Sequence, residues 1–246
     1  FVIVGYIVAY RSFMDNRCVA ICDSGAGGLS VLKILRQKYD KENFVFLSDN
    51  LNMPYGDKTE EEMAAIAQSV IKRALSFAPK LVIAACNTLS VTLDKINLDY
   101  GVKIIKTLPK VGKGNGYLFC TPFTAVSPFV KKLAVGKAEI VPLKSLAGEV
   151  ERAVRAGEKP YIDEKSYDRL CKLEKKVDFI SLGCTHYSFV AEEFKKIFPR
   201  AEILDGTSET IRKSCDFLSQ NPANRPFGEI YICDEQLKNA FNARPE

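Results

Sequence analysis

Apolar residues along this chain gather into short continuous runs, and most runs are followed by a stretch with the apolar spacing of an amphipathic helix. Continuous apolar runs are typical of strands that are buried on both faces of a parallel sheet. Strands that alternate with helices predict parallel sheets covered by helices, and therefore an α/β protein. The runs that predict strands span residues 18–22, 44–47, 81–85, 102–105, 117–120, 179–183, 202–204 and 227–233.

Two of these strands end in turns with similar chemistry. Cys86 and Cys184 each close an apolar run, and a threonine follows each of them within two residues. Ligands of open α/β sheets collect outside the carboxyl ends of the strands, and a helix N-terminus stabilises a thiolate. A single cysteine at a strand end is more often a small buried apolar residue than a nucleophile. Two cysteines at equivalent places in two half-repeats predict instead one site that is built from two related halves.

Each cysteine has a candidate titratable neighbour. His186 stands two residues after Cys184, and Asp23 ends the strand that we expect beside the strand of Cys86. His186 could equally be a lone buried histidine with satisfied hydrogen bonds, and Asp23 could equally cap the first helix. Two thiols on opposite sides of one cleft suit the inversion of a carbon stereocentre, because one removes a proton from one face and the other returns a proton to the opposite face. A thiol pKa of about 8.5 allows one sulfur to be a thiolate while the other is a thiol.

The turn after the first strand is rich in glycine. Residues 23–28 read D-S-G-A-G-G, which is not the dinucleotide-binding fingerprint. Three glycines in four positions let the backbone approach a ligand closely and leave N–H groups free for an anion. We therefore expect this turn, together with the polar turns at Asn87, Thr88 and Thr121, to hold the carboxylates and the ammonium group of a small substrate.

The composition excludes several classes of protein. The formal net charge is +5, and the lysines are scattered in pairs, which favours solvated helix faces over a nucleic-acid-binding stripe. Eight cysteines in a chain of 246 residues do not indicate a disulfide scaffold, and a single histidine with no C-x-x-C pair argues against a structural zinc site. We expect reduced thiols in a cytoplasmic protein, with no metal ion and no nucleic-acid or membrane partner.

The first residues form an apolar run that we interpret apart from the fold. Residues 1–10 are too few to span a bilayer, and neither a preceding basic segment nor a following small-residue cleavage site marks a signal peptide. Met14, which precedes a polar stretch and then a clear strand, is typical of a natural start. We expect residues 1–16 to be a leader outside the fold, with a short membrane-associating anchor as the alternative.

Four motifs together carry a resemblance to a known family. They are D-S-G-A-G-G at residues 23–28, P-Y-G-D-K at 54–58, A-C-N-T at 85–88 and L-G-C-T-H at 182–186. Their types and their order resemble the glutamate racemases of the aspartate/glutamate racemase family, over roughly residue 17 to the end of the chain. The pattern D-S-G-x-G-G in particular favours the glutamate branch over the aspartate branch.

The resemblance implies a cofactor-independent enzyme that interconverts L- and D-glutamate by two-base proton transfer and supplies D-glutamate for peptidoglycan. It assigns catalysis to Cys86 and Cys184, with Asp23 supporting Cys86 and His186 supporting Cys184. It also implies a homodimer with no metal and no cofactor. The glutamate-binding residues that it implies are Asp23, Ser24, Pro54, Tyr55, Gly56, Asn87, Thr88, Thr121, Thr124, Thr185 and His186.

The resemblance also implies the fold, which is two facing α/β domains with mostly parallel sheets, related by pseudo-symmetry, and an active site in the cleft between them. Residues 106–116 carry three glycines and one proline and predict a connection between the two domains. We expect residues 17–101 and 206–246 to form the first domain and residues 102–205 to form the second.

The chain departs from the family pattern shortly after residues 141–143. The family usually places a glutamate there, whereas Lys144 and Ser145 stand at that place and the next acids are Glu149 and Glu151. Three other functions stay open. They are a racemase of aspartate or of another small acidic amino acid, a catalytically weak homologue with a binding role, and a hydrolase that pairs one thiol with a histidine. Loss of one thiol leaves such a hydrolase partly active, whereas stereoinversion needs both.

Overall fold

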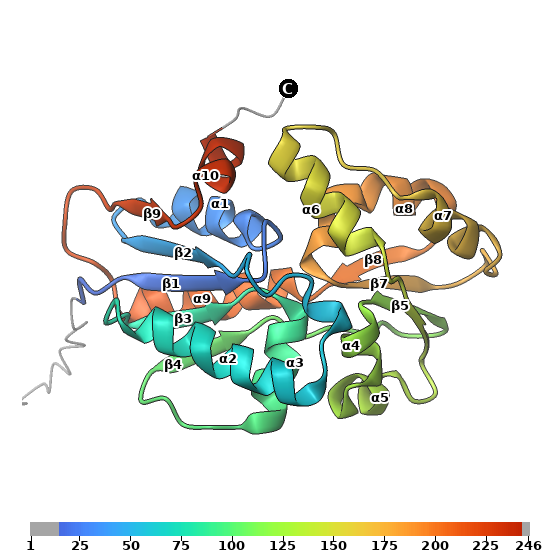
Figure 1. Cartoon of the computed structure of the whole chain (residues 1–246), viewed down its shortest axis with the longest axis horizontal. Coiled ribbons are helices and arrows are strands. Elements are labelled where there is room, and N and C mark those ends of the chain that lie inside the picture. The colour runs from blue at the N-terminus through green and yellow to red at the C-terminus, as the bar shows by residue number, and fades with distance from the viewer. Residues whose placement is uncertain (1–14, 243–246) are drawn as a thin grey trace, which may run out of the picture.

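The computed structural model describes residues 15–242, which contain two parallel β-sheets that lie side by side (Figure 1). The first sheet has the strand order β4-β3-β1-β2-β9, the second has the order β6-β5-β7-β8, and every neighbouring pair of strands runs parallel. The predicted α/β class is thus confirmed. The strands are β1 (Val19–Asp23), β2 (Phe44–Ser48), β3 (Leu81–Ala84), β4 (Lys103–Lys106), β5 (Gly116–Cys120), β6 (Ala138–Pro142), β7 (Phe179–Gly183), β8 (Glu202–Asp205) and β9 (Ile230–Ile232).

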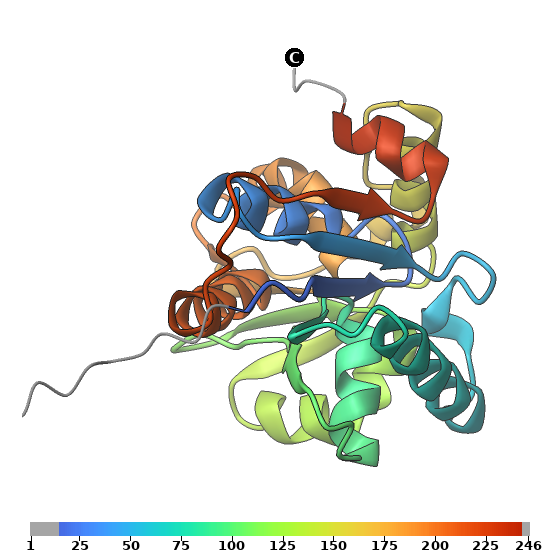
Figure 2. The same cartoon turned by 90° about the vertical axis from the view of Figure 1, so that its left-hand side faces the viewer.

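Helices cover both faces of the first sheet (Figure 2). They are α1 (Leu29–Lys38), α2 (Glu60–Leu75), α3 (Asn87–Ile96), α9 (Thr207–Gln220) and α10 (Glu235–Asn242), with the 3-10 helix η1 (Tyr55–Asp57) at one end. α2 and α3 bury Met63 and Leu89 against one face, and α1, α9 and α10 bury Leu32, Leu218 and Leu237 against the other. The continuous apolar runs of the sequence are explained by this burial, because β1 is covered on both sides along its whole length. We call the first sheet with these helices the first unit.

The second sheet is covered in the same way. Its helices are α4 (Pro122–Val126), α5 (Pro128–Ala134), α6 (Leu146–Ala156), α7 (Glu164–Cys171), the 3-10 helix η2 (Thr185–Val190) and α8 (Ala191–Ile197). One face packs against α6, α7, η2 and α8, with Val150, Leu170 and Phe194 in the core. On the other face Val130 of α5 packs with Val91 of α3, so α3 contributes to the packing of both sheets. We call the second sheet with these helices the second unit.

The two units repeat one topology. The strands β4-β3-β1-β2 of the first sheet and β8-β7-β5-β6 of the second follow each other in the same spatial order, and β9 extends the first sheet beside β2. β3 leads into Cys86 and α3, while β7 leads into Cys184 and η2. The two cysteines therefore follow equivalent strands. This repeat confirms the predicted pseudo-symmetric arrangement.

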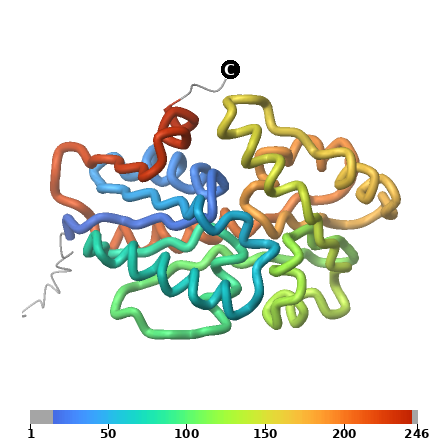
Figure 3. The backbone as a smooth tube through the Cα atoms, viewed as in Figure 1, coloured from blue at the N-terminus to red at the C-terminus, as the bar shows by residue number. Residues whose placement is uncertain are grey.

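The chain passes from the first unit to the second after β4 and returns after β8 (Figure 3). β4 pairs in parallel with β3 and forms the edge of the first sheet, although we assigned residues 102–205 to the second domain. That boundary was wrong for β4. A helix followed by a neighbouring parallel strand is the usual connection within one sheet, and α3 links β3 to β4 in this way. Among residues 15–242, no helix is long and apolar enough to cross a membrane.

The described structure begins inside the segment that we expected to be a leader. The backbone N–H of Asp15 donates to Pro222 O at 3.0 Å, and Asn16 Oδ1 accepts from the N–H of Asn224 at 2.9 Å. Lys80 Nζ, which forms a buried ion pair with Glu42 at 2.7 Å, also donates to Asp15 O at 2.7 Å. Asp15 and Asn16 therefore belong to the fold, and the leader prediction was wrong for them. Residues 1–14 of that prediction lie outside the described residues.

Candidate active site

A cavity of about 540 Å³ opens where strands of both sheets end. Ser24, Cys86, Thr121 and Cys184 follow β1, β3, β5 and β7, and all four line this cavity. The carboxyl ends of parallel strands meet at one edge of a sheet, which brings these residues together in each unit. The predicted cleft between the two units is thus observed. The predicted site residues that line it are Ser24, Pro54, Tyr55, Gly56, Cys86, Thr88, Thr121, Cys184 and His186.

Cys86 forms part of the cavity wall contributed by the first unit. It occupies the N-cap position of α3 and is only 6% exposed. The hydroxyl of Ser24 donates towards Cys86 Sγ at 3.7 Å. Burial, together with the nearby charge of Asp23, raises the pKa of Cys86 to about 12. The Cys86 sulfur therefore holds its proton at neutral pH.

Cys184 occupies the equivalent place in the second unit, directly before η2. Its Sγ lies 3.9 Å from Nδ1 of His186, and Nε2 of the same ring lies 2.6 Å from Glu151 Oε2. Burial by itself lowers the pKa of His186, but the contacts with Cys184 and Glu151 outweigh burial and raise this pKa well above 6.5. His186 is therefore an imidazolium at neutral pH, held between a sulfur and a carboxylate.

Glu151 is the site residue that we missed from the sequence. It lies on α6, is 1% exposed, and accepts from Ala26 N at 2.7 Å and from Arg155 Nε at 2.6 Å in addition to its contact with His186. Burial opposes its ionisation, but the hydrogen bond and charge of His186 outweigh burial and lower the pKa of Glu151. A signal was present, because Glu151 stands beside the buried Val150 and one helical turn before an arginine.

The glycine-rich turn after β1 makes close contacts with the second unit. A Cβ atom at Gly25 would lie 2.4 Å from Glu151 Oε2, and one at Gly27 would lie 2.3 Å from Thr185 Oγ1. The turn also offers the N–H of Ala26 to the Glu151 carboxylate. These glycines are therefore required for the contact between the two units, and the N–H group of Ala26 binds an anion that belongs to the protein itself.

Asp23 is fully buried at the end of β1 and does not line the cavity. Its Oδ1 accepts from the N–H of Gly25 at 2.9 Å, and its Oδ2 accepts from Thr185 Oγ1 at 3.3 Å. Burial raises the pKa of Asp23 to about 6, against the opposing effect of the nearby His186 cation. Asp23 acts on Cys86 through its charge, while the hydroxyl of Ser24 is the hydrogen-bond partner of that sulfur.

Three threonine hydroxyls join the two units beside the cavity. Thr88 Oγ1 lies 3.0 Å from Thr121 Oγ1 and 3.0 Å from Thr124 Oγ1, and Thr121 Oγ1 donates to Thr124 Oγ1 at 3.0 Å. Thr88 and Thr121 line the cavity, whereas Thr124 is completely buried behind them. The N-terminal turns of α3 and α4 are thereby held together.

Two other residues that we predicted to bind substrate have side chains with protein partners. Asn87 Nδ2 donates to Thr107 O at 2.9 Å, and Thr185 Oγ1 donates to Asp23, so neither residue lines the cavity. η1 supplies the remaining predicted residues. There the hydroxyl of Tyr55 donates to Asp49 Oδ2 at 2.7 Å, which fixes the tyrosine in the cavity wall.

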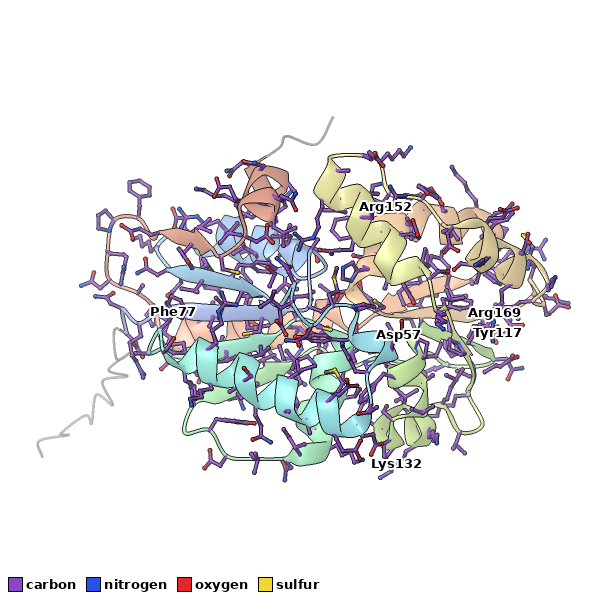
Figure 4. All side chains as sticks on the ribbon, viewed as in Figure 1. Asp57, Phe77, Tyr117, Lys132, Arg152 and Arg169 are labelled. Atoms are coloured by element: carbon purple, nitrogen blue, oxygen red, sulfur yellow. The ribbon has the colours of Figure 1, made fainter. Side chains whose placement is uncertain are left out.

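Basic side chains that we did not predict also line the cavity. Lys144, Lys165 and Arg169 line it from the second unit, and all three side chains are exposed. The carboxylates that line it are Asp57 and Glu149; Figure 4 labels Asp57 on η1 and Arg169 on α7. Cations outnumber these carboxylates, so the mouth of the cavity favours an anionic ligand. Among residues 15–242, no cluster of three or more His, Cys, Asp or Glu residues is arranged to hold a metal ion.

Relatives of the chain are found among curated proteins, although no protein-family model matches it. It is 31% identical over 214 residues to a glutamate racemase of Campylobacter concisus, an alignment that covers 79% of this chain and 80% of the relative. It is 30% identical over 224 residues to a glutamate racemase of Carboxydothermus hydrogenoformans, with 82% and 80% covered. The chain belongs to the glutamate racemase family.

Solved structures of this family share the fold. A crystal structure of Escherichia coli glutamate racemase in complex with L-glutamate and the activator UDP-MurNAc-Ala matches with a TM-score of 0.76 and 21% identity, and the match covers 90% of this chain and 92% of that one. At this identity the likeness concerns the fold alone.

In this member of the glutamate racemase family the cavity brings together two kinds of sulfur. Cys86 lies beside a hydroxyl and near a buried carboxylate, and Cys184 lies beside an imidazolium. A cation next to a sulfur favours negative charge on it, whereas burial next to a carboxylate favours the protonated form. The arrangement therefore places two sulfurs with differently charged neighbours at the same cavity.

Proposed function

We propose that this protein interconverts L- and D-glutamate without a cofactor, by two-base proton transfer between the substrate and the sulfurs of Cys86 and Cys184. One observation carries the proposal. The two sulfurs follow equivalent strands of two units with the same topology, and both line a single cavity. A pair of acid–base groups contributed by two opposing walls suits removal of a proton from one face of a carbon and return of a proton to the other.

The proposed reaction moves one proton in each half. A thiolate takes the proton from the α-carbon of glutamate, and the bonding electron pair stays on the substrate as a carbanion delocalised into the α-carboxylate. The thiol on the opposite face then gives its proton to that carbon. One sulfur ends as a thiol and the other as a thiolate, so the reverse reaction uses the same groups in exchanged roles.

The neighbours of the sulfurs support distinct roles. We assign the His186 imidazolium, oriented by Glu151, to stabilising negative charge on Cys184. We assign Asp23, through its charge, and Ser24, through its hydroxyl, to Cys86. The proposal thereby keeps the predicted pairing of Asp23 with Cys86 and of His186 with Cys184.

The proposed contacts with glutamate use the polar groups at the cavity wall. Ser24, Thr88 and Thr121 offer hydroxyls, and the N-terminus of α3 offers backbone N–H groups that suit a carboxylate. Pro54, directly before η1, and Tyr55 and Gly56 within it also line the cavity. The remaining predicted residues act through neighbours: Thr124 orients Thr88 and Thr121, Thr185 holds Asp23, and Asn87 contributes through its backbone at the start of α3.

The wider setting follows from this activity. We propose that the D-glutamate is used for peptidoglycan and that the protein works in the cytoplasm, where this precursor is needed. A homodimer, and the division of the chain into two domains that correspond to the two units, stay predictions.

Proton NMR of L-glutamate in heavy water, with the purified protein, tests the proposal. We expect loss of the α-proton signal and formation of D-glutamate. Cys86→Ser and Cys184→Ser should each lower racemisation by about 10³-fold, since each removes one of two obligatory proton carriers. Cys171→Ser, which changes an exposed cysteine on α7, is the control and should racemise normally.

Other outcomes lead to other functions. Exchange with aspartate and none with glutamate would assign the protein to a different acidic amino acid. Hydrolase activity that survives the loss of Cys86 would favour a hydrolase that uses one thiol. No exchange with either amino acid would refute the racemase and leave a binding role.

A further inference from the structure

Glu151 is tied to the first unit by a second residue of α6. Arg155, one helical turn after Glu151, donates from Nε to Glu151 Oε1 at 2.6 Å. From Nη1 the same guanidinium reaches Asp234 Oδ2 at 2.8 Å and Gln236 Oε1 at 3.2 Å, and from Nη2 it reaches Asn50 Oδ1. A single side chain therefore links the acid beside His186 to groups on the other side of the cleft.

The partners of Arg155 are fixed parts of the first unit. Asp234 follows β9, and its Oδ1 accepts from the N–H of Leu237 at 3.0 Å in the first turn of α10. Asn50 lies just after β2, the strand that pairs with β9, and its side-chain amide donates to the Asp234 carboxylate. α6 and α10 pack against each other, at the top of the molecule as Figure 1 is drawn. The groups that hold Arg155 therefore lie just after two neighbouring strands and at the start of α10.

The geometry needs an arginine. Only a guanidinium offers several N–H donors in a rigid planar fork, and here the fork serves one carboxylate on its own helix and one on the opposite unit. The Arg155 side chain is 17% exposed, and its two carboxylate partners are 1% and 8% exposed, so these contacts are largely shielded from water. Shielded charge pairs with this many hydrogen bonds hold their partners in place far better than surface pairs.

We infer that Arg155 is a positioning residue, which is anchored by Asp234 and Asn50 of the first unit, holds the Glu151 carboxylate against His186, and thereby sets the geometry of proton exchange at Cys184. The inference rests on the proposed racemase function for its effect on catalysis. Its effect on His186 does not depend on that function. The C-terminal segment, far from the cavity in sequence, becomes part of the support of one catalytic half.

The matched pair of variants lies on one helix. Arg155→Met removes the fork, and Arg152→Met removes an exposed arginine of α6 that pairs with Glu149 and Glu158 (Figure 4). Asp234→Asn removes the anchoring charge but keeps a side-chain oxygen that can cap α10. Arg155→Lys keeps the charge without the fork and tests whether directional hydrogen bonds are required.

The chain contains one histidine, so its imidazole signals in an NMR spectrum belong to His186 alone. The short contact with Glu151 predicts a far-downfield, slowly exchanging Nε2–H proton in the unaltered protein. We expect Arg152→Met to keep this signal and Arg155→Met to lose it. Asp234→Asn should broaden or shift it, and Arg155→Lys should restore only part of it.

The kinetic expectation is a change in kcat more than in KM, because Arg155 does not line the cavity. Arg155→Met should lower kcat for glutamate racemisation by about tenfold and change KM by less than about twofold. Arg152→Met should leave both unchanged. If Arg155 contributed only to stability, Arg155→Met would lower the melting temperature. At a temperature where that variant is folded, its kcat and its His186 signal would then be unaltered.

The outcomes separate the two proposals. An intact Nε2–H signal and kcat in folded Arg155→Met would overturn the inference, as would equal losses in Arg152→Met. If Arg155→Met does not fold, the same comparison with Asp234→Asn decides. Absence of the downfield proton in the unaltered protein would also refute the inference. A protein that shows the signal and its dependence on Arg155 but does not racemise glutamate would refute only the proposed function.

Discussion

The two halves of the cavity share one backbone topology and differ in charge. On the first unit Cys86 has Ser24 as its hydrogen-bond partner, and the nearby Asp23 is a buried carboxylate that no ion pair in residues 15–242 neutralises. On the second unit Cys184 lies next to His186, which is paired with Glu151. A carboxylate therefore influences one sulfur and a cation influences the other.

The difference in charge between the two halves comes from the neighbours of the two sulfurs. The repeated strands place a cysteine at an equivalent strand end in each unit. The charged residues that surround each cysteine are not repeated. The neighbours come from different places. Asp23 ends β1 and Ser24 follows it directly, whereas Glu151 reaches His186 from α6. Similar folds can thus place a buried carboxylate near one sulfur and an imidazole ring beside the other.

The largest effect on this comparison is expected from Glu151→Gln, which removes the carboxylate from the Cys184 half. We expect the pKa of His186 to fall, because its hydrogen bond to an anion is lost. The value of kcat for glutamate racemisation should fall by about 10²-fold. NMR titration of the single histidine and polarimetry measure the two changes. Since enantiomers have equal free energy, kcat/KM must stay equal in both directions, which provides an internal control.

The same variant should also lose stability, with a defined pH dependence. The pKa of Glu151 is lowered from 4.5 in the folded protein, so its contribution to stability is present above that value and is lost as the pH falls through the folded pKa. Breaking a buried pair by removing one partner costs about 3–5 kcal/mol in free energy of unfolding. Urea unfolding at neutral pH and in acid should show a deficit that shrinks in acid. Glu158→Gln, on the exposed surface, is the control.

Asp23→Asn should change stability in the opposite direction. Burial raises the pKa of Asp23 from 3.8 to about 6, so its favourable contribution is complete below 3.8 and is lost as the pH rises through about 6. At neutral pH the ionised carboxylate costs roughly 1–3 kcal/mol, which asparagine removes. We therefore expect a more stable but less active protein at neutral pH, and equal stability near the unfolded pKa. A variant that is less stable at every pH would show that contacts, not charge, dominate at Asp23.

The smallest effect is expected from Lys144→Met, at the mouth of the cavity on the Cys184 side. Loss of one cation from this mouth weakens the attraction of anionic glutamate over long range, so kcat/KM should fall about two- to fivefold at low ionic strength. The deficit should vanish in about 1 M salt, where charges are screened. Lys132→Met, on α5 and outside the cavity lining (Figure 4), should show no such salt-dependent loss.

Much of the fold could be predicted because its signals are local. Buried strands appear as continuous apolar runs, and the two thiols could be recognised because each directly ends such a run. The start of α2 is equally local, with the Thr59 hydroxyl accepting from the N–H of Glu62 at 3.2 Å in a capping box. The edge strand β4 was assigned to the wrong sheet because its pattern shows a strand without showing its neighbour.

The candidate site could be predicted only in part, for a related reason. The sequence shows which residue types stand at the strand ends, but not where their side chains bind. Asn87 was expected to contact substrate, and its amide instead holds the connection between the units at Thr107. Glu151 lies 35 residues before His186, so no spacing rule joins them. Their contact exists because α6 packs against η2, which carries His186.

Local patterns in the chain were enough to predict the alternation of strands and helices, the placement of Cys86 and Cys184 at strand ends, and the resemblance to the glutamate racemase family. These features depend on residues that are adjacent or one turn apart. The packing of the two units in space brings the two thiols to one cavity and sets which charged groups surround each of them. Those charges act across the interface between two units, and the electrostatic effect of a buried group is fixed by distance and burial in space, which local sequence does not encode.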